Sequence, residues 1–253
     1  MKKILLIGIF VGICLIGVLF FNVKVRENEN LSSVSGNEYE VYGEKLGDIT
    51  YPQISNLEDQ ELEDKINENL SNVFEEDLDC AKIQYYSDAP EILFQNEDYL
   101  SVKTVLYYFN PNIGSGKTLS FPIYQTISLK TGELLQLDDF LEVSDELAQF
   151  LLDSPVAIRA VKHENGDVIW DESLDIETRA YIKENISVEE MRVYLDEANM
   201  YYDAEKYSVK CAFYLSEGEI NIVQDTGVVD IPIYFKIRLE VDDIEEFLRV
   251  PKW

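Results

Sequence analysis

The chain contains little histidine, cysteine or positive charge. Its 253 residues include one histidine, His163, three cysteines, and 21 lysine and arginine residues against 49 acidic ones. A lone histidine excludes sites built from several histidine ligands, and we predict no metal and no cofactor. The formal net charge of −28 repels phosphate backbones, so we expect no nucleic acid partner. A surface this acidic suits cations, basic proteins or simple solubility.

The three cysteines leave room for one intrachain disulfide. Cys14 lies inside an apolar run, so only Cys80 and Cys211 remain for pairing in the folded part. An external compartment would permit that disulfide, and two buried thiols would fit the strand-like runs around both residues equally well. Both alternatives stay open at this point.

An unbroken apolar run occupies residues 4–21. As a helix it would be about 27 Å long, close to the thickness of a hydrocarbon core. No small-x-small cleavage site follows closely, and Cys14 lacks the small preceding residue of a lipoprotein signal. Two lysines in residues 1–3 favour a cytoplasmic N-terminus. We therefore predict a single-pass signal anchor in the cell membrane, with residues 1–3 as a cytoplasmic tip.

The rest of the chain divides into a linker and a folded domain. Residues 22–37 are polar and are predicted to form a flexible linker. Residues 38–253 are predicted to form an extracytoplasmic domain with an N-terminal half at about 38–130 and a C-terminal half at about 131–253. Its 16 tyrosines and 12 phenylalanines are ample for a core.

Strand and helix patterns are grouped along this domain rather than strictly alternating, which predicts an α+β fold with antiparallel sheets and packed helices. Asn56 is expected to cap a helix, Ser154 and Pro155 to begin a short helix, and Ser187 with Glu190 to form a capping box. The main strand-like runs are residues 38–54, 81–86, 91–95, 99–109, 119–129, 207–215, 219–223 and 231–241.

Several motifs that could carry chemistry have simpler interpretations. Residues 114–118 resemble the end of a phosphate-binding loop, but Pro111 stands where the first glycine belongs, so we predict a connecting loop and no nucleotide. His163 is expected at a polar helix end, with no second histidine for zinc and no triad pattern. The acidic pairs are predicted to be solvated faces rather than a shared catalytic site: they are Asp138 with Asp139, Asp242 with Asp243, and Glu245 with Glu246.

Three tyrosine doublets are candidates for contact with a partner: Tyr85 with Tyr86, Tyr107 with Tyr108, and Tyr201 with Tyr202. Successive side chains on a strand face opposite sides, so each of the first two doublets should bury one ring and display the other. A displayed ring can stack on a sugar or anchor a protein, and ordinary sheet packing is the simpler alternative. The partner-binding residues remain unknown from the sequence.

Five short stretches resemble a known family: residues 51–54, 99–102, 128–133, 137–140 and 213–215. They resemble the extracytoplasmic domains of unknown function shared by RsiV-type anti-sigma factors, which bind lysozyme, and the N-terminal part of PdaC-type peptidoglycan deacetylases. The resemblance covers about residues 38–250 and is carried by structural motifs, so it transfers no catalytic residue. It implies a bacterial protein that binds at the cell envelope.

Two departures from that family narrow the expected function. Only residues 1–3 precede the predicted span, so we expect no segment that holds a sigma factor, and one histidine is too few for a deacetylase site. The expectation is a non-catalytic envelope module that binds a cationic protein such as lysozyme, or cell-wall glycan. The alternatives are an envelope hydrolase acting on peptidoglycan and a structural subunit of a membrane assembly.

Overall fold

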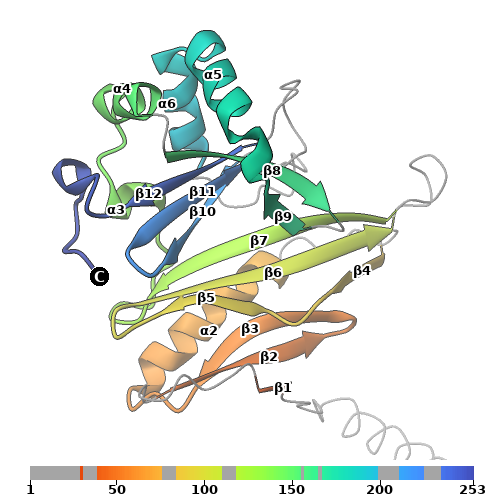
Figure 1. The fold of residues 1–253 in the computed structure, drawn as a ribbon. Helices are drawn as coiled ribbons and strands as arrows, with labels where there is room; N and C mark the ends of the chain where they lie inside the picture. The colour runs from red at the N-terminus through yellow and green to blue at the C-terminus, as the bar shows by residue number, and fades with distance from the viewer. Residues whose placement is uncertain are drawn as a thin grey trace, which may run out of the picture.

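The computed structural model describes residues 29–30, 39–75, 84–109, 118–154, 157–164, 167–198, 211–224 and 235–253 (Figure 1). The predicted cytoplasmic tip and membrane anchor lie outside these residues, as does nearly all of the predicted linker. Among the helices of the described part, none is long and apolar enough to cross a membrane.

Three antiparallel sheets and a small set of helices make up the described fold, which confirms the predicted α+β class. The first sheet has the order β1-β2-β3, formed by Glu29–Asn30, Glu40–Leu46 and Ile49–Ser55. In the second, the long strand β6 pairs with β7 on one side and with both β4 and β5 on the other. Their bounds are Gln84–Ser87 for β4, Glu91–Gln95 for β5, Tyr99–Phe109 for β6 and Thr118–Ser128 for β7.

The third sheet has the order β10-β11-β12-β8-β9 and carries the helices of the C-terminal half on one face. The strands are β8 Ile158–Glu164, β9 Asp167–Trp170, β10 Cys211–Ser216, β11 Glu219–Gln224 and β12 Phe235–Glu240. The helices are α3 Leu137–Phe140, α4 Asp145–Asp153, α5 Asp175–Asn185 and α6 Val188–Glu197, with short 3₁₀ turns at η3 Glu172–Leu174 and η4 Glu245–Phe247.

Helix α2, Gln60–Glu75, forms because its apolar residues recur at helical spacing, with Ile66, Leu70 and Phe74 fully buried. Its cap differs from the predicted one: Asp59 Oδ1 accepts hydrogen bonds from the Glu61 and Leu62 N–H groups. Asn56, the predicted cap, instead adopts a left-handed backbone with φ of 73°. A short asparagine side chain tolerates that conformation better than most residues do.

The turn after β7 is fixed by α2. Gly132 has a φ of 74°, and a Cβ at this position would lie 3.2 Å from Leu62 Cδ1. Lys65 Nζ donates to the Thr131 carbonyl at 2.8 Å, and Asn69 Nδ2 donates to the Gly132 carbonyl at 2.7 Å. Glycine is therefore required here both by the backbone conformation and by the close approach of the helix.

The C-terminal core lies between the third sheet and its helices. Phe235, Ile237 and Leu239 alternate along β12 and are almost fully buried, while α4 contributes Leu147 and Leu151 from the other side. Helix α6 begins at the predicted capping box: Ser187 Oγ accepts from the Glu190 N–H at 3.2 Å, and Glu190 accepts from the Ser187 N–H at 2.8 Å. This prediction is confirmed.

The predicted helix after Ser154 is wrong. Ser154 ends α4 as its C-cap, and from Ile158 the chain runs as strand β8, paired with β12. His163 accordingly lies on β8 instead of at a helix end. The physical reason is long-range. Ile158 is buried in the C-terminal core and Ala160 is buried as well, which favours pairing with β12 over a local helix start.

The second and third sheets meet through β10. The Leu215 N–H donates to Ser101 Oγ at 3.1 Å, and the Tyr124 and Tyr214 rings stack at 5.1 Å. Tyr99 on β6 packs edge-on against Phe140 at 5.2 Å. Buried contacts thus join the N-terminal and C-terminal halves.

Candidate functional site

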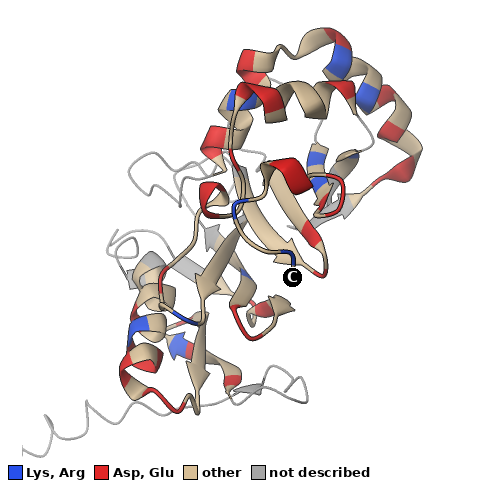
Figure 2. Ribbon diagram, turned by 90° about the vertical axis from the view of Figure 1, so that its left-hand side faces the viewer, with Lys and Arg blue, Asp and Glu red and all other residues tan. Residues whose placement is uncertain are grey.

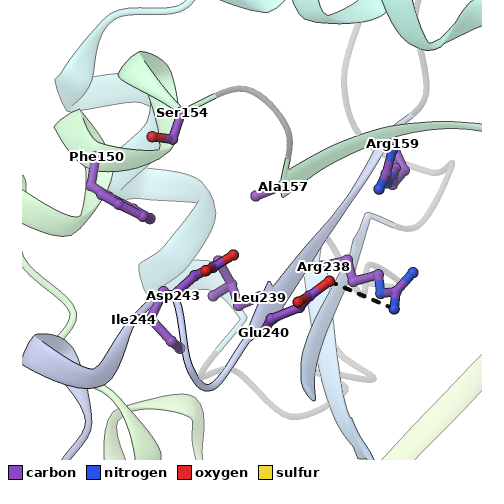
Figure 3. A pocket seen from close by; sticks show the side chains of 9 residues that line it. All are labelled: Phe150, Ser154, Ala157, Arg159, Arg238, Leu239, Glu240, Asp243 and Ile244. Carbon is purple, nitrogen blue, oxygen red and sulfur yellow. Dashed lines mark ion pairs between the residues drawn. The ribbon is translucent and has the colours of Figure 1, made fainter. Parts of the chain in front are cut away.

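A cavity of about 330 Å³ lies beside the end of β12 (Figure 3). Strand β8 pairs with β12 only from Phe235 to Ile237, so the next residues, Arg238 to Glu240, border the cavity where that pairing stops. Phe150 of α4, Leu239 and Ile244 supply its apolar lining. The volume is at the lower end of the range for small-molecule pockets.

Charged side chains line the rest of the cavity. Arg159 and Arg238 approach from the sheet, and Glu240 and Asp243 stand on the strand end and the turn after it. Arg238 Nε donates to Glu219 Oε1 at 2.7 Å, and Arg238 lies 3.9 Å from Glu240 Oε1. The hydrogen bonds to Glu219 raise the pKa of Arg238 above its ordinary value. The guanidinium is therefore held in one place at the edge of the cavity.

Arg159 is positioned by the buried carboxylate of Asp175. Asp175 accepts hydrogen bonds from the Ala160 N–H at 2.8 Å, from Trp170 Nε1 at 3.2 Å, from Arg159 at 3.2 Å and from Arg179 at 3.0 Å. Burial alone would raise the pKa of Asp175, but these hydrogen bonds and the Arg179 charge outweigh it and lower the pKa. The carboxylate stays ionised and anchors strand β8 to helix α5.

Trp170 completes this network. The Arg159 guanidinium lies 5.2 Å from the centre of the Trp170 ring, within the range of a cation–π interaction. The ring itself is partly exposed. Arg159 is thus held by a carboxylate and an aromatic face together.

Lys236 lies on the same face of the sheet. It is the cross-strand partner of Arg159 and stands two residues before Arg238 on β12. Residues at this spacing project from the same face of a strand. Burial lowers the pKa of Lys236, the Arg238 and Arg159 charges lower it further, and Glu219 opposes them. Arg159, Lys236 and Arg238 are called the cationic cluster below.

Exposed carboxylates lie on two adjoining segments, and two of them, Glu240 and Asp243, border the cavity. The Glu142 N–H donates to the Phe247 carbonyl at 2.8 Å, and Leu141 bridges to Leu248, so the chain around α3 and α4 lies beside η4. Figure 2 shows acidic residues outnumbering basic ones over this part of the fold. We define the acidic surface by its exposed residues: Asp139, Glu142, Asp145, Glu146, Asp153, Glu240, Asp242, Asp243, Glu245 and Glu246.

The cations near the acidic surface are already engaged. Lys252 Nζ contacts Asp242 at 2.8 Å and Glu245 at 3.3 Å. Arg192 contacts Asp196 at 3.2 Å and Asp145 at 3.7 Å, and Arg249 donates to the Asp138 carbonyl at 2.9 Å. A large excess of negative charge remains on this side of the molecule.

The acidic pairs behave largely as predicted. Both members of the pairs at 242–243 and 245–246 are exposed, as is Asp139, whereas Asp138 is half-buried. Asp139 has a local role, because its carboxylate accepts from the Gln136 N–H at 2.7 Å at the start of α3. These side chains therefore contribute surface charge and helix capping.

One tyrosine doublet displays a ring. Tyr86 is 43% exposed and stacks on Tyr107 at 4.9 Å between ring centres, and Tyr107 donates to Asp88 at 2.6 Å. The structure says nothing of the Tyr85 and Tyr108 side chains. The third doublet, Tyr201 with Tyr202, lies outside the described residues.

Other sequence candidates are only partly described. Residues 110–117 and Cys80 lie outside the described part, and of Cys211 only the backbone, at the start of β10, is described. Of His163, likewise, only its place on β8 is known. Within the described ranges, no group of three or more histidine, cysteine, aspartate or glutamate residues is placed to hold a metal ion.

The cavity and the cationic cluster were not predicted from the sequence. The one available signal was the alternation in residues 235–240, where apolar residues alternate with Lys236, Arg238 and Glu240. That pattern shows that two cations share a strand face. It cannot show that Arg159 is their neighbour, because the register of β8 on β12 joins distant parts of the chain.

No protein-family model matches the chain, and no curated protein matches it. Among solved structures, the chain is similar to a DUF3298 family protein from Pseudomonas aeruginosa. The two are 10% identical with a TM-score of 0.40, over 88% of this chain and 94% of that one.

Proposed function

We propose that this chain is a non-catalytic binding module of the bacterial cell envelope that recognises a cationic protein such as lysozyme. Residues 4–21 anchor it in the membrane with the N-terminus inside, and the α+β domain stands outside the cell. The acidic surface is the binding face. The observation that carries this proposal is the excess of exposed carboxylates on the acidic surface, where Lys252 and Arg192 are already paired.

The physical basis is electrostatic complementarity. Opposite charge on two proteins accelerates their encounter and selects the partner, more than it adds affinity for any one contact. The net charge of −28 works in the same direction over the whole chain. The family resemblance found in the sequence supports lysozyme as the cationic protein to test first.

The direct experiment is binding of lysozyme to the full chain in a non-ionic detergent. The Debye length is about 30 Å at an ionic strength of 0.01 M and about 3 Å at 1 M. We expect clear binding at low salt and a steep loss at high salt. Absence of binding at low salt would remove lysozyme as the partner.

The placement outside the cell has its own test. Protease added to intact cells should cut the domain and leave a short membrane-bound fragment. Recovery of the intact chain from protease-treated cells, or from the soluble cytosolic fraction, would contradict the proposed topology.

Cell-wall glycan is the second candidate partner, favoured by the exposed Tyr86 ring stacked on Tyr107. Flat aromatic faces bind the apolar faces of sugars. We expect the full chain to sediment with isolated peptidoglycan and Tyr86→Ala to sediment less. Release of soluble wall fragments by the wild-type chain would instead favour a hydrolase.

A further inference from the structure

Positive charges gather at one point of the third sheet, around β12 and the start of β8. Around the Asp175 network and β12 lie four cations, Arg159, Arg179, Lys236 and Arg238, against three carboxylates, those of Asp175, Glu219 and Glu240. Asp175 engages Arg159 and Arg179, and Glu219 engages Arg238. Lys236 is left without a counter-charge of its own.

The Lys236 side chain is half-buried and makes no hydrogen bond or ion pair with any residue that the structure describes. Two guanidinium groups flank it on the same face, Arg159 across the strand pair and Arg238 along β12. Removing an ammonium group from water is costly unless an anion or hydrogen-bond acceptors replace the water. The repulsion from its neighbours adds to that cost, as its lowered pKa reflects.

Arg159, at the same place, has a buried hydrogen-bond donor without an acceptor. Its Nε atom is buried and has no hydrogen-bond acceptor within the described ranges, although its terminal nitrogen contacts Asp175. Buried donors in folded proteins almost always find an acceptor. Arg159 and Arg238 both line the cavity, so an oxyanion in the cavity would lie beside both guanidinium groups, and a shift of the Arg159 side chain would bring the buried Nε within its reach.

We propose that Arg159, Lys236 and Arg238 form an oxyanion subsite, which takes a carboxylate or phosphate group from a ligand that enters the adjoining cavity. Such a group supplies several acceptor oxygens, and its negative charge offsets the positive charge of Lys236, which has no carboxylate partner among the described residues. The apolar lining from Phe150, Leu239 and Ile244 then contacts the rest of the ligand. The subsite does not rest on the proposed function, because its cations are not part of the acidic surface, although Glu240 and Asp243 of that surface border the same cavity.

The first test needs no variant. The full chain in non-ionic detergent is treated with an amine-acylating reagent in sodium phosphate, sodium acetate or sodium chloride of equal ionic strength, and each lysine is followed by mass spectrometry. At a probe concentration ten times its dissociation constant, acylation of Lys236 should slow roughly tenfold. Lys130, which is paired with Asp98 on the surface, should react at the same rate in all three salts.

The three salts also separate the two sources of an oxyanion. Protection by phosphate alone indicates a phosphate-bearing ligand, and protection by acetate as well indicates that a carboxylate suffices. Protection by either probe supports the subsite. Equal acylation of Lys236 in all three salts overturns it.

A matched set of variants provides the second test. In the wild type, in Lys236→Arg and in the control Lys130→Met, phosphate should raise the thermal unfolding midpoint above its value in chloride. Lys236→Met should lose that phosphate-dependent rise. A rise in Lys236→Met equal to that of the wild type contradicts the subsite. If Lys236→Met does not fold, the acylation of the wild-type chain decides the question.

Discussion

Two groups of positive charges in the domain are held in different ways, the lysines near the turn after β7 and the cationic cluster of the third sheet. Lys65 and Lys130 of the N-terminal half form ion pairs at the surface with Glu133, just beyond that half, and with Asp98, and solvent screens these pairs. In the C-terminal half, Arg159, Lys236 and Arg238 lie half-buried on one face of the sheet beside a cavity. Paired surface lysines suit solubility, whereas a half-buried cationic cluster suits recognition.

The negative charges differ as well. The acids of α2, such as Glu61 and Glu68, lie on the solvent side of an amphipathic helix whose other side is buried. The acidic surface of the C-terminal half comes from two separate segments that the backbone contacts of Leu141 and Glu142 with η4 and Leu248 bring together. An amphipathic helix needs a polar face in any protein, so its acids say little about binding. Acids that two separate segments bring together are the better support for a binding surface.

The largest expected effect tests whether the halves fold as one unit. Phe140→Ala removes a fully buried ring that contacts Tyr99 of one half and Phe213 of the other. We expect a loss of about 4 kcal/mol in the free energy of unfolding, from lost burial and the cavity left behind. Urea unfolding followed by tryptophan fluorescence and by circular dichroism measures it.

The matched variant is Ile66→Ala, which empties a fully buried position in α2. Each substitution should shift one common transition seen by both probes. If two transitions were seen and each variant shifted only one of them, the halves would be independent domains.

The second effect concerns the Asp175 network. Asp175→Asn leaves Arg159 and Arg179 without their buried carboxylate, and we expect a loss of about 3 kcal/mol at neutral pH. That is the low end for a broken buried pair, because both guanidinium groups are about one-fifth exposed. Glu177→Gln, an exposed acid on the same helix, should change stability by less than about 0.5 kcal/mol.

The pH dependence of this effect follows from the lowered pKa of Asp175. A carboxyl whose folded pKa is depressed stabilises the fold above its unfolded pKa of about 3.9, and that stabilisation is lost as pH falls through the folded pKa. The gap between the wild type and Asp175→Asn should therefore narrow below about pH 4. A gap of constant size down to the acid transition would contradict the ionised network.

The smallest loss of stability is expected for a substitution at the junction between the halves. Ser101→Ala removes the acceptor of the Leu215 N–H and the partner of Thr126 Oγ1, both in buried surroundings. A loss of about 2 kcal/mol is expected. Amide hydrogen exchange at Leu215 should accelerate in this variant and stay unchanged in the control Ser71→Ala, whose hydroxyl is bonded only within α2. Unchanged protection of Leu215 would mean that Ser101 does not join the sheets.

Local patterns predicted much of the fold. The runs at 91–95 and 99–109 match β5 and β6, and the capping box at Ser187 and Glu190 marks the start of α6. Such features depend on neighbouring residues, so a single sequence contains them. The α+β class followed from the way these runs are grouped.

Long-range contacts account for what was missed. Helix α5 was not predicted, because the positions it buries include Asp175 and Thr178, which weaken its apolar stripe. The sequence predicts a helix start at Ser154 and Pro155, just before β8, because β12, the strand that pairs with β8, lies far along the chain. The cationic cluster depends on that same pairing, so it could not be predicted before the register was known.

The most direct test of the proposed function compares matched charge variants of the two halves for lysozyme binding by the full chain at low salt. One set removes four negative charges from the acidic surface: Glu142→Gln, Glu146→Gln, Asp243→Asn and Glu246→Gln. The other removes four from the N-terminal half: Asp48→Asn, Glu58→Gln, Glu61→Gln and Glu68→Gln. We expect the first set to weaken binding roughly tenfold and the second by less than about twofold. Equal weakening by both sets, or binding that neither set changes, would contradict recognition through the acidic surface.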